Sequence, residues 1–162
     1  MTNLFETRDA TLSKDRRYRY ALWRRWGDGP YLLFIGLNPS TADEYEDDPT
    51  IRRCRRFAMD WGFDALCMAN LFAWRATAPT DMKAAKDPVG RDNDAWLRKL
   101  AAGAGRTVAA WGVHGGHQGR DQAVMRLVPG LHHLGLTKAG HPRHPLYLPA
   151  STLPQPWAAQ DR

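Results

Sequence analysis

The sequence predicts a single three-layer α/β domain, in which a central, mostly parallel four-stranded sheet lies between helices on its two faces. Four short apolar runs, at residues 31–37, 64–72, 107–111 and 131–136, are typical of strands buried on both faces. Stretches with helical spacing of apolar residues separate them, and such alternation favours parallel strands joined by right-handed crossovers. Because 162 residues are enough for one core and few for two, we expect no second domain.

The N-terminal part carries weaker patterns. Residues 1–13 show no periodicity and predict a flexible arm. Tyr18, Tyr20 and Leu22 alternate with other residues before the turn at 27–30, which predicts an antiparallel edge strand over residues 17–26, with a short helix as the alternative. The basic residues of this part either contact phosphates or form a solvated charged edge. They are Lys14, Arg16, Arg17, Arg19, Arg24 and Arg25.

The first apolar run ends at Gly36 and is followed by a short polar loop. Gly36 permits a close backbone approach, Pro39 stiffens the turn, and Asn38 brings an amide that both donates and accepts hydrogen bonds. In open α/β sheets ligands bind at the carboxyl ends of the strands. This loop therefore indicates a binding site, and an ordinary strand-to-loop turn is the alternative.

An acidic segment and a basic helix follow. Five of the six residues at 43–48 are acidic, and Asp48-Pro49 is typical of a helix start with an N-cap and a proline in the first turn. The helix is expected to end near Gly62. Its arginines either reach phosphates or pair with the acids just upstream. They are Arg52, Arg53, Arg55 and Arg56.

Polar residues also follow the later strands. Asn70 lies near the end of the second strand and Arg75 shortly after it, and a helix is expected over residues 92–102. The third strand leads into residues 112–119, where four glycines either bring backbone N–H groups to a phosphate or serve the turn alone. A further helix is expected over residues 120–127.

The loop after the fourth strand reads His141-Pro-Arg-His-Pro145 and is stiffened by its two prolines. A histidine held at this edge suits hydrogen bonding to a carbonyl oxygen that gains negative charge, and a histidine packed in a loop is the alternative. Residues 149–162 form a Pro-rich tail.

Composition limits the partners and the chemistry. The formal net charge of +6 favours an anionic partner such as DNA or a nucleotide. Cys54 and Cys67 lie in apolar patterns typical of reduced core thiols, and with neither a leader nor an 18-residue apolar run we expect a cytoplasmic protein without a membrane span. A monomer is expected.

Several kinds of site lack their usual motifs. A metal site using His114 and His117 with the acidic segment has no HExxH or CxxC support, so neither a metal nor a cofactor is expected. Ser40 is not in a GxSxG elbow, no GxGxxG or GxxxxGK fingerprint occurs, and no carboxylate pair suggests a sugar hydrolase. The strand ends therefore predict a site that binds and polarises its ligand.

Four segments in sequence resemble the uracil-DNA glycosylase superfamily. Gly36-Leu-Asn-Pro-Ser40 is similar to its first motif, which places the attacking water, and the segment 68–75 is similar to its second strand, whose asparagine reads the base. Ala110-Trp-Gly112 resembles its third-strand ending, and the segment 141–146 resembles its closing loop, which carries a base-binding histidine and a leucine wedge. The resemblance covers roughly residues 31–148 and implies a uracil-DNA glycosylase-like fold.

The resemblance also implies roles for individual residues. Asn38 would position water, and Asn70 would read the base. Either His141 or His144 would stabilise the leaving base, and His144 is favoured because it precedes the Pro-Leu of the wedge. Phosphate would be held by Arg75 or Arg143. The remaining expected substrate contacts are Gly36, Leu37, Pro39, Ser40, Gly112 and Leu146.

The sequence departs from the glycosylases in two places. The closing loop has Arg143-His144 where they have serine, and the first loop lacks the activating aspartate of the fastest uracil enzymes. The acidic segment beside that loop would also repel a phosphate backbone. At closer range, the chain resembles a family of small prokaryotic domains of unknown function over nearly its whole length. The resemblance is carried by the segments 37–43, 47–54, 70–73 with Arg75, and 142–148.

These observations predict an N-glycosidase that excises uracil or a modified base from DNA. The base would be flipped into the site and stacked on an aromatic side chain. A non-catalytic domain that binds nucleic acid or a nucleotide is the first alternative. A hydrolase of small nucleotides or nucleosides is the second.

Overall fold

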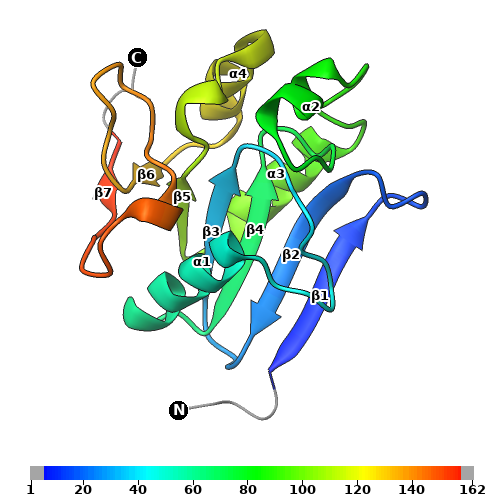
Figure 1. Cartoon of the computed structure of the whole chain (residues 1–162). Helices are drawn as coiled ribbons and strands as arrows, with labels where there is room; N and C mark the ends of the chain where they lie inside the picture. The colour runs from blue at the N-terminus through cyan, green and yellow to red at the C-terminus, as the bar shows by residue number, and fades with distance from the viewer. Residues whose placement is uncertain (1–5, 158–162) are drawn as a thin grey trace.

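The computed structural model describes residues 6–157 and contains one mixed sheet of seven strands (Figure 1). The spatial order of the strands is β1-β2-β4-β3-β5-β6-β7. The strands are β1 (Thr7–Leu12), β2 (Arg19–Arg25), β3 (Tyr31–Gly36), β4 (Ala65–Asn70), β5 (Arg106–Ala109), β6 (Leu131–His133) and β7 (Gln155–Pro156). The α/β class predicted from the sequence is confirmed.

The four apolar runs become the neighbouring strands β4, β3, β5 and β6, and each adjacent pair among them is parallel. Antiparallel strands extend the sheet on both sides, with β2 and β1 beyond β4 and with β7 beyond β6. The expected count of four strands was therefore wrong. The outermost strands β1 and β7 carry no apolar pattern, and they join the sheet because backbone hydrogen bonding needs none.

Three expectations for the chain ends need correction. Residues 7–12 form β1 rather than a flexible arm. The antiparallel strand expected over residues 17–26 is confirmed as β2, so the helix alternative is wrong, but β1 makes β2 an inner strand rather than an edge strand. The Pro-rich tail contributes β7. The rest of the expected arm and tail, residues 1–5 and 158–162, lies outside the described part.

The helices agree with the helical patterns except for one. The structure contains α1 (Pro49–Asp60), α2 (Pro79–Ala84), α3 (Asn93–Gly103), α4 (Arg120–Leu127) and the 3₁₀ turns η1 (Gly112–His114), η2 (His117–Gly119) and η3 (Pro145–Tyr147). The short helix α2 was missed because Met82 is its single buried side chain, which leaves no apolar periodicity. Among residues 6–157 no helix has the length and apolar character that a membrane crossing requires.

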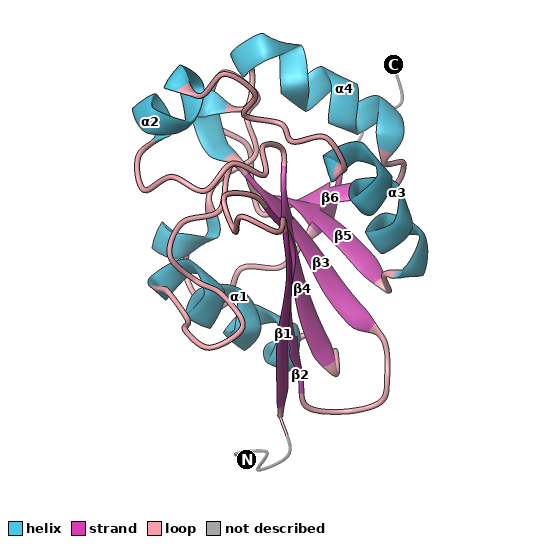
Figure 2. Cartoon of the chain, turned by 90° about the vertical axis from the view of Figure 1, so that its right-hand side faces the viewer, coloured by secondary structure: helices cyan, strands magenta, loops and turns pink. Residues whose placement is uncertain are grey.

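Helices cover both faces of the sheet (Figure 2). On one face, α1 packs through Ile51, Cys54 and Phe57, while α3 and α4 contribute to a separate core on the other face. Both cysteines are free and fully buried, and burial raises the pKa of each thiol. They are inert core thiols at neutral pH.

The parallel register fixes where the polar loops begin. Gly36, the last residue of β3, lies opposite Asn70, the last residue of β4. β5 runs parallel to β3, so the chain leaves all three strands at the same edge of the sheet. The loops that follow these strands therefore lie next to one another at this edge of the sheet.

Candidate functional site

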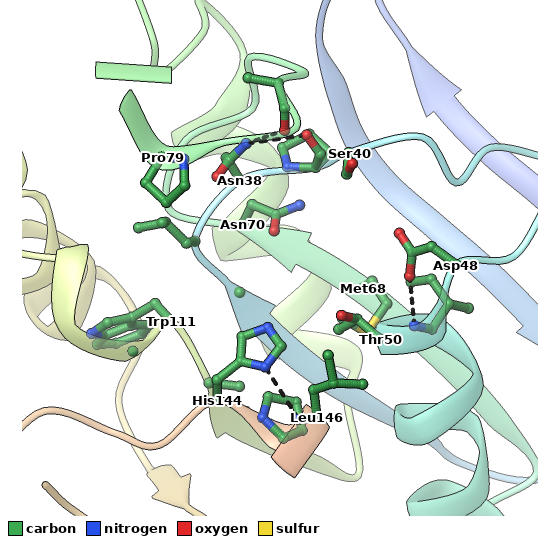
Figure 3. Close-up of a pocket in the computed structure, with 18 of the residues that line it drawn as sticks. Asn38, Ser40, Asp48, Thr50, Met68, Asn70, Pro79, Trp111, His144 and Leu146 are labelled. Atoms are coloured by element: carbon green, nitrogen blue, oxygen red, sulfur yellow. Dashed lines mark hydrogen bonds between the residues drawn. The ribbon is translucent and has the colours of Figure 1, made fainter. Parts of the chain in front are cut away.

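A cavity of about 540 Å³ lies at the carboxyl ends of β3, β4 and β5 (Figure 3). Its walls are the loop after β3, the start of α1, the loop before α2, η1 and η3. Sequence reasoning expected nine of its lining residues, which are Gly36, Leu37, Asn38, Pro39, Ser40, Asn70, Gly112, His144 and Leu146. Their shared location follows from the common direction of the strands.

The amide of Asn38 is fixed by two backbone acceptors. Its Nδ2 donates to the carbonyl oxygens of Ala76, at 2.8 Å, and Pro39, at 3.2 Å. These bonds identify the nitrogen end of the amide and leave Oδ1 able to accept a hydrogen bond. Asn38 thus provides an oriented acceptor at the cavity wall.

Asn70 presents a buried amide with an unsatisfied donor. The residue is 4% exposed, and its Nδ2 has no hydrogen-bond partner in the described structure. A buried donor without a partner costs about 1–3 kcal/mol. The arrangement therefore favours a ligand that supplies an acceptor to Asn70.

The His144 imidazole points into the cavity from the loop before η3 (Figure 3). Its Nδ1 accepts a hydrogen bond from the Leu146 backbone N–H at 3.1 Å. Because a backbone N–H only donates, the neutral ring carries its proton on Nε2. Desolvation lowers the pKa of His144, and the charge of Asp48 opposes this only in part. At neutral pH His144 is an uncharged Nε2–H donor.

Asp48 is a cavity residue that sequence reasoning recognised only as a helix cap. One carboxylate oxygen accepts from the Ile51 backbone N–H at 2.9 Å, and the other is directed toward the cavity (Figure 3). Its charge acts on both His144 and Arg19. The Asp-Pro motif revealed the cap, but the packing of α1 against the sheet decided what the second oxygen faces.

Arg19 is a second cavity residue that was not singled out for the site. It is 2% exposed, its Nη1 donates to the Ala42 carbonyl at 2.9 Å, and its Nε has no partner in the described structure. Burial lowers the pKa of Arg19 to about 10, although Asp48 acts in the opposite direction. A cation and a carboxylate therefore share one side of the cavity.

The acidic segment beside the cavity is neutralised in part by arginines of β1, of β2 and of the turn between them. Asp47 pairs with Arg24 at 2.9 Å and with Arg8 at 3.2 Å, and Glu44 pairs with Arg16. The helix arginines mostly bind elsewhere, since Arg55 pairs with Glu6 and Arg56 with Asp60. The repulsion expected between this segment and a phosphate backbone is accordingly reduced.

Three predicted site residues do not line the cavity. Arg75 lies beside it and donates to the carbonyls of Ser40, Arg16 and Thr41 at 3.2–3.4 Å. His141 and Arg143 lie outside, where their backbone N–H groups bond to the segment 135–137. Of the two histidines left open by the sequence, only His144 reaches the cavity.

The remaining predictions for this edge have mixed outcomes. The Gly-rich loop forms η1 and η2, and only residues 112–114 of it line the cavity. Leu146 lines the cavity and is half-buried, whereas the next residue, Tyr147, is 88% exposed. Within residues 6–157 no group of three or more His, Cys, Asp or Glu side chains is placed to hold a metal ion.

Comparison with known proteins gives a family but no characterised relative. No curated protein and no solved structure matches the chain. A family match spans residues 19–146, and Arg19 and Leu146 are also the first and last residues of the cavity. The protein therefore belongs to the family described as "Protein of unknown function (DUF1643)".

Proposed function

We propose that the protein is an N-glycosidase that excises uracil or a modified base from DNA. The observation that carries this proposal is the convergence of Asn38, Asn70 and the neutral Nε2–H of His144 on one cavity. Its volume of about 540 Å³ falls within the range of roughly 300–1,000 Å³ that small-ligand sites occupy. A flipped nucleobase fits such a space.

Each polar group has a role that its geometry suits. Asn70 reads the edge of the base, and the oriented Oδ1 of Asn38 accepts a hydrogen bond from the attacking water. As the water oxygen bonds to the sugar carbon, the glycosidic C–N bond breaks and its electron pair stays on the base. His144 donates Nε2–H to the base oxygen that gains negative charge. The free oxygen of Asp48 takes the proton of the water.

The resemblance to the uracil-DNA glycosylase superfamily supports the same assignment. Its motif order matches the order in which Asn38, Asn70 and His144 reach the cavity. The activating aspartate that the first loop lacks has a substitute in Asp48, which arrives from the start of α1. The carboxylate enters the site from a different segment, so a modified base is as suitable a substrate for the proposed reaction as uracil.

The direct test is excision from defined oligonucleotides. The protein is incubated with strands bearing uracil, hypoxanthine, xanthine or hypermodified pyrimidines, and alkali-labile sites are then sought. Cleavage at one of these bases supports the proposal. Tight binding without excision from any of them would favour the binding domain instead.

A Gly36→Ala substitution should weaken the site with little effect on folding. A Cβ at position 36 would lie 2.9 Å from Oδ1 of Asn70 and would displace that amide. We expect excision to fall about 10-fold and the free energy of unfolding to change by about 1 kcal/mol. Gly116→Ala is the matched control, because a Cβ there meets no atom within 4 Å. Equal rates for the two variants would contradict the role of Asn70.

Acidification should inactivate the protein through His144. Because desolvation lowers the pKa of His144, the ring stays neutral at pH 7 and becomes protonated at a lower pH than an ordinary histidine. Protonation of Nδ1 removes the acceptor of the hydrogen bond from the Leu146 N–H. We expect kcat/KM to be flat near pH 7 and to fall in acid. A rise in acid would show that protonated His144 is the active form.

A non-catalytic binder of nucleic acid is the second candidate. The surface next to the cavity favours it, because a surface with basic and aromatic side chains binds a polymer without any chemistry. It is formed by the exposed Arg16 and Arg17 and the half-buried Trp74 and Arg75. The salt dependence of binding distinguishes a polymer from a small nucleotide, since phosphate contacts release counterions.

A further inference from the structure

A second cavity of about 410 Å³ adjoins the first. The two share a border formed by Ser40, Thr41, Ala76 and Thr77. On the far side of this border lie Arg16, Arg17, Trp74 and Arg75. A ligand that filled the first cavity could therefore continue into the second without leaving the surface.

The Trp74 ring is a fixed aromatic platform at the far side. It makes a T-shaped contact with the Tyr18 ring, with ring centroids 5.3 Å apart, and its backbone bridges to that residue. The Arg17 guanidinium carbon lies 6.0 Å from the Trp74 ring centroid, at the outer limit of a cation–π contact. Both groups are held by the β1–β2 hairpin and the segment after β4.

Arg17 is the cation of this cavity that is open to an anionic ligand. It is exposed, and no acidic side chain lies within ion-pair distance of it in the described structure. Arg16 is instead paired with Glu44, and Arg75 is occupied by three backbone carbonyls. Asp15 lies near Arg17 and interacts with its guanidinium only beyond ion-pair distance. An incoming phosphate therefore meets one cation that has no ion-pair partner in the described structure, beside an aromatic ring.

The border between the cavities carries hydroxyl groups. The side chains of Ser40, Thr41 and Thr77 make no hydrogen bond within residues 6–157. Hydroxyls donate well to phosphate oxygens, which are anionic acceptors. Going from the first cavity to the second, a ligand thus meets a pocket the size of a base, then the hydroxyl groups of the border, and then a cation and an aromatic ring.

We propose that the second cavity binds the nucleotide next to the one in the main cavity, with its base on Trp74 and its phosphate on Arg17 and the border hydroxyls. This inference rests on the proposed function for the nucleic-acid class of the ligand. It adds a subsite that recognises a single strand through stacking and charge rather than through base edges.

The test is fluorescence anisotropy with a labelled single-stranded oligodeoxynucleotide of about ten nucleotides. Trp74→Ala should weaken binding about 10-fold, the usual effect of losing one stacked base. Arg17→Ala should weaken binding and reduce the slope of log K against log salt by about 0.7, the contribution of one phosphate contact to a single strand. Arg17→Lys should retain the slope.

Arg98→Ala is the control, because the substitution removes the same charge from an exposed arginine of α3 that lines neither cavity. The proposal is overturned if Arg17→Ala binds and responds to salt like Arg98→Ala, or if the wild-type protein binds no oligonucleotide. Arg17 is exposed, so its variant reports on the subsite even if Trp74→Ala fails to fold. Binding lost in Arg17→Ala, in a protein that excises nothing, would support the subsite and refute the glycosidase.

Discussion

Replacing Asn38 or His144 by alanine should lower the rate of base excision by about 10²-fold or more, with binding of the intact strand weakened far less. In the proposed reaction, charge on the base oxygen appears only as the glycosidic bond breaks, so the Nε2–H of His144 would stabilise the transition state more than the bound substrate. In the proposed reaction Asn38 acts on the attacking water, which contributes little to binding of the strand. Single-turnover kinetics and anisotropy measure the two quantities separately.

Asp48→Asn refines this prediction. Asparagine is as good an N-cap as aspartate, so the bond to the Ile51 N–H and the stability of α1 should be retained. The variant loses the proton acceptor, and we expect excision to fall by about 10²-fold while the thermal midpoint stays near that of the wild type. Asp48→Ala should lose about 1 kcal/mol of stability in addition.

His132→Ala is the control for these variants, because this histidine lies on β6 and outside the cavity. It should excise at the wild-type rate. Wild-type rates in Asn38→Ala would remove the proposed role of the ordered amide. Wild-type rates in Asp48→Asn alone would leave water activation to another group and keep the rest of the mechanism.

The largest effect on stability is expected for Arg24→Met. Arg24 is fully buried on β2, where it pairs with Asp47 at 2.9 Å and donates to the carbonyls of Trp23, Asp43 and Glu46. Methionine fills a similar volume but leaves these acceptors without their donor. We expect the free energy of unfolding, measured by urea denaturation, to fall by about 3 kcal/mol.

Arg8→Met is the matched control, because Arg8 contacts the same carboxylate at 3.2 Å from a side chain that is 38% exposed. Solvent screens that pair, and its loss should cost less than about 1 kcal/mol. Similar losses for the two variants would show that burial does not set the strength of the Arg24 pair. Since Arg24 holds the segment that leads to Asp48, its variant should also excise more slowly in native buffer.

Local patterns were enough to locate most of the elements and part of the site. The buried strands and α1 were predictable because their signals lie in residues close together in the sequence. These signals are a continuous apolar run for each strand, and helical spacing with an Asp-Pro start for α1. Asn38 and Asn70 could be named because both lie at the ends of apolar strands. Position alone linked them to the carboxyl edge of a parallel sheet.

Contacts distant in sequence escaped the same reasoning. The segment 7–12 has no apolar pattern, and it became a strand only because β2 offered its backbone groups. Asp48 was readable as a cap, yet its second oxygen reached the cavity through the packing of α1. Arg75 had the charge expected of a phosphate ligand, but backbone carbonyls of two other segments took up its guanidinium.

The sequence by itself determined the α/β class, the parallel strands and the loops that carry the amides and the stiff histidine loop. Only the tertiary structure decided that His144 rather than His141 faces the cavity, and that Arg19 and Asp48 share it. The physical reason is the distance along the chain over which each kind of interaction acts. Periodicity and turn chemistry act over a few residues, whereas the direction and charge environment of a side chain depend on segments that meet only when the sheet has formed.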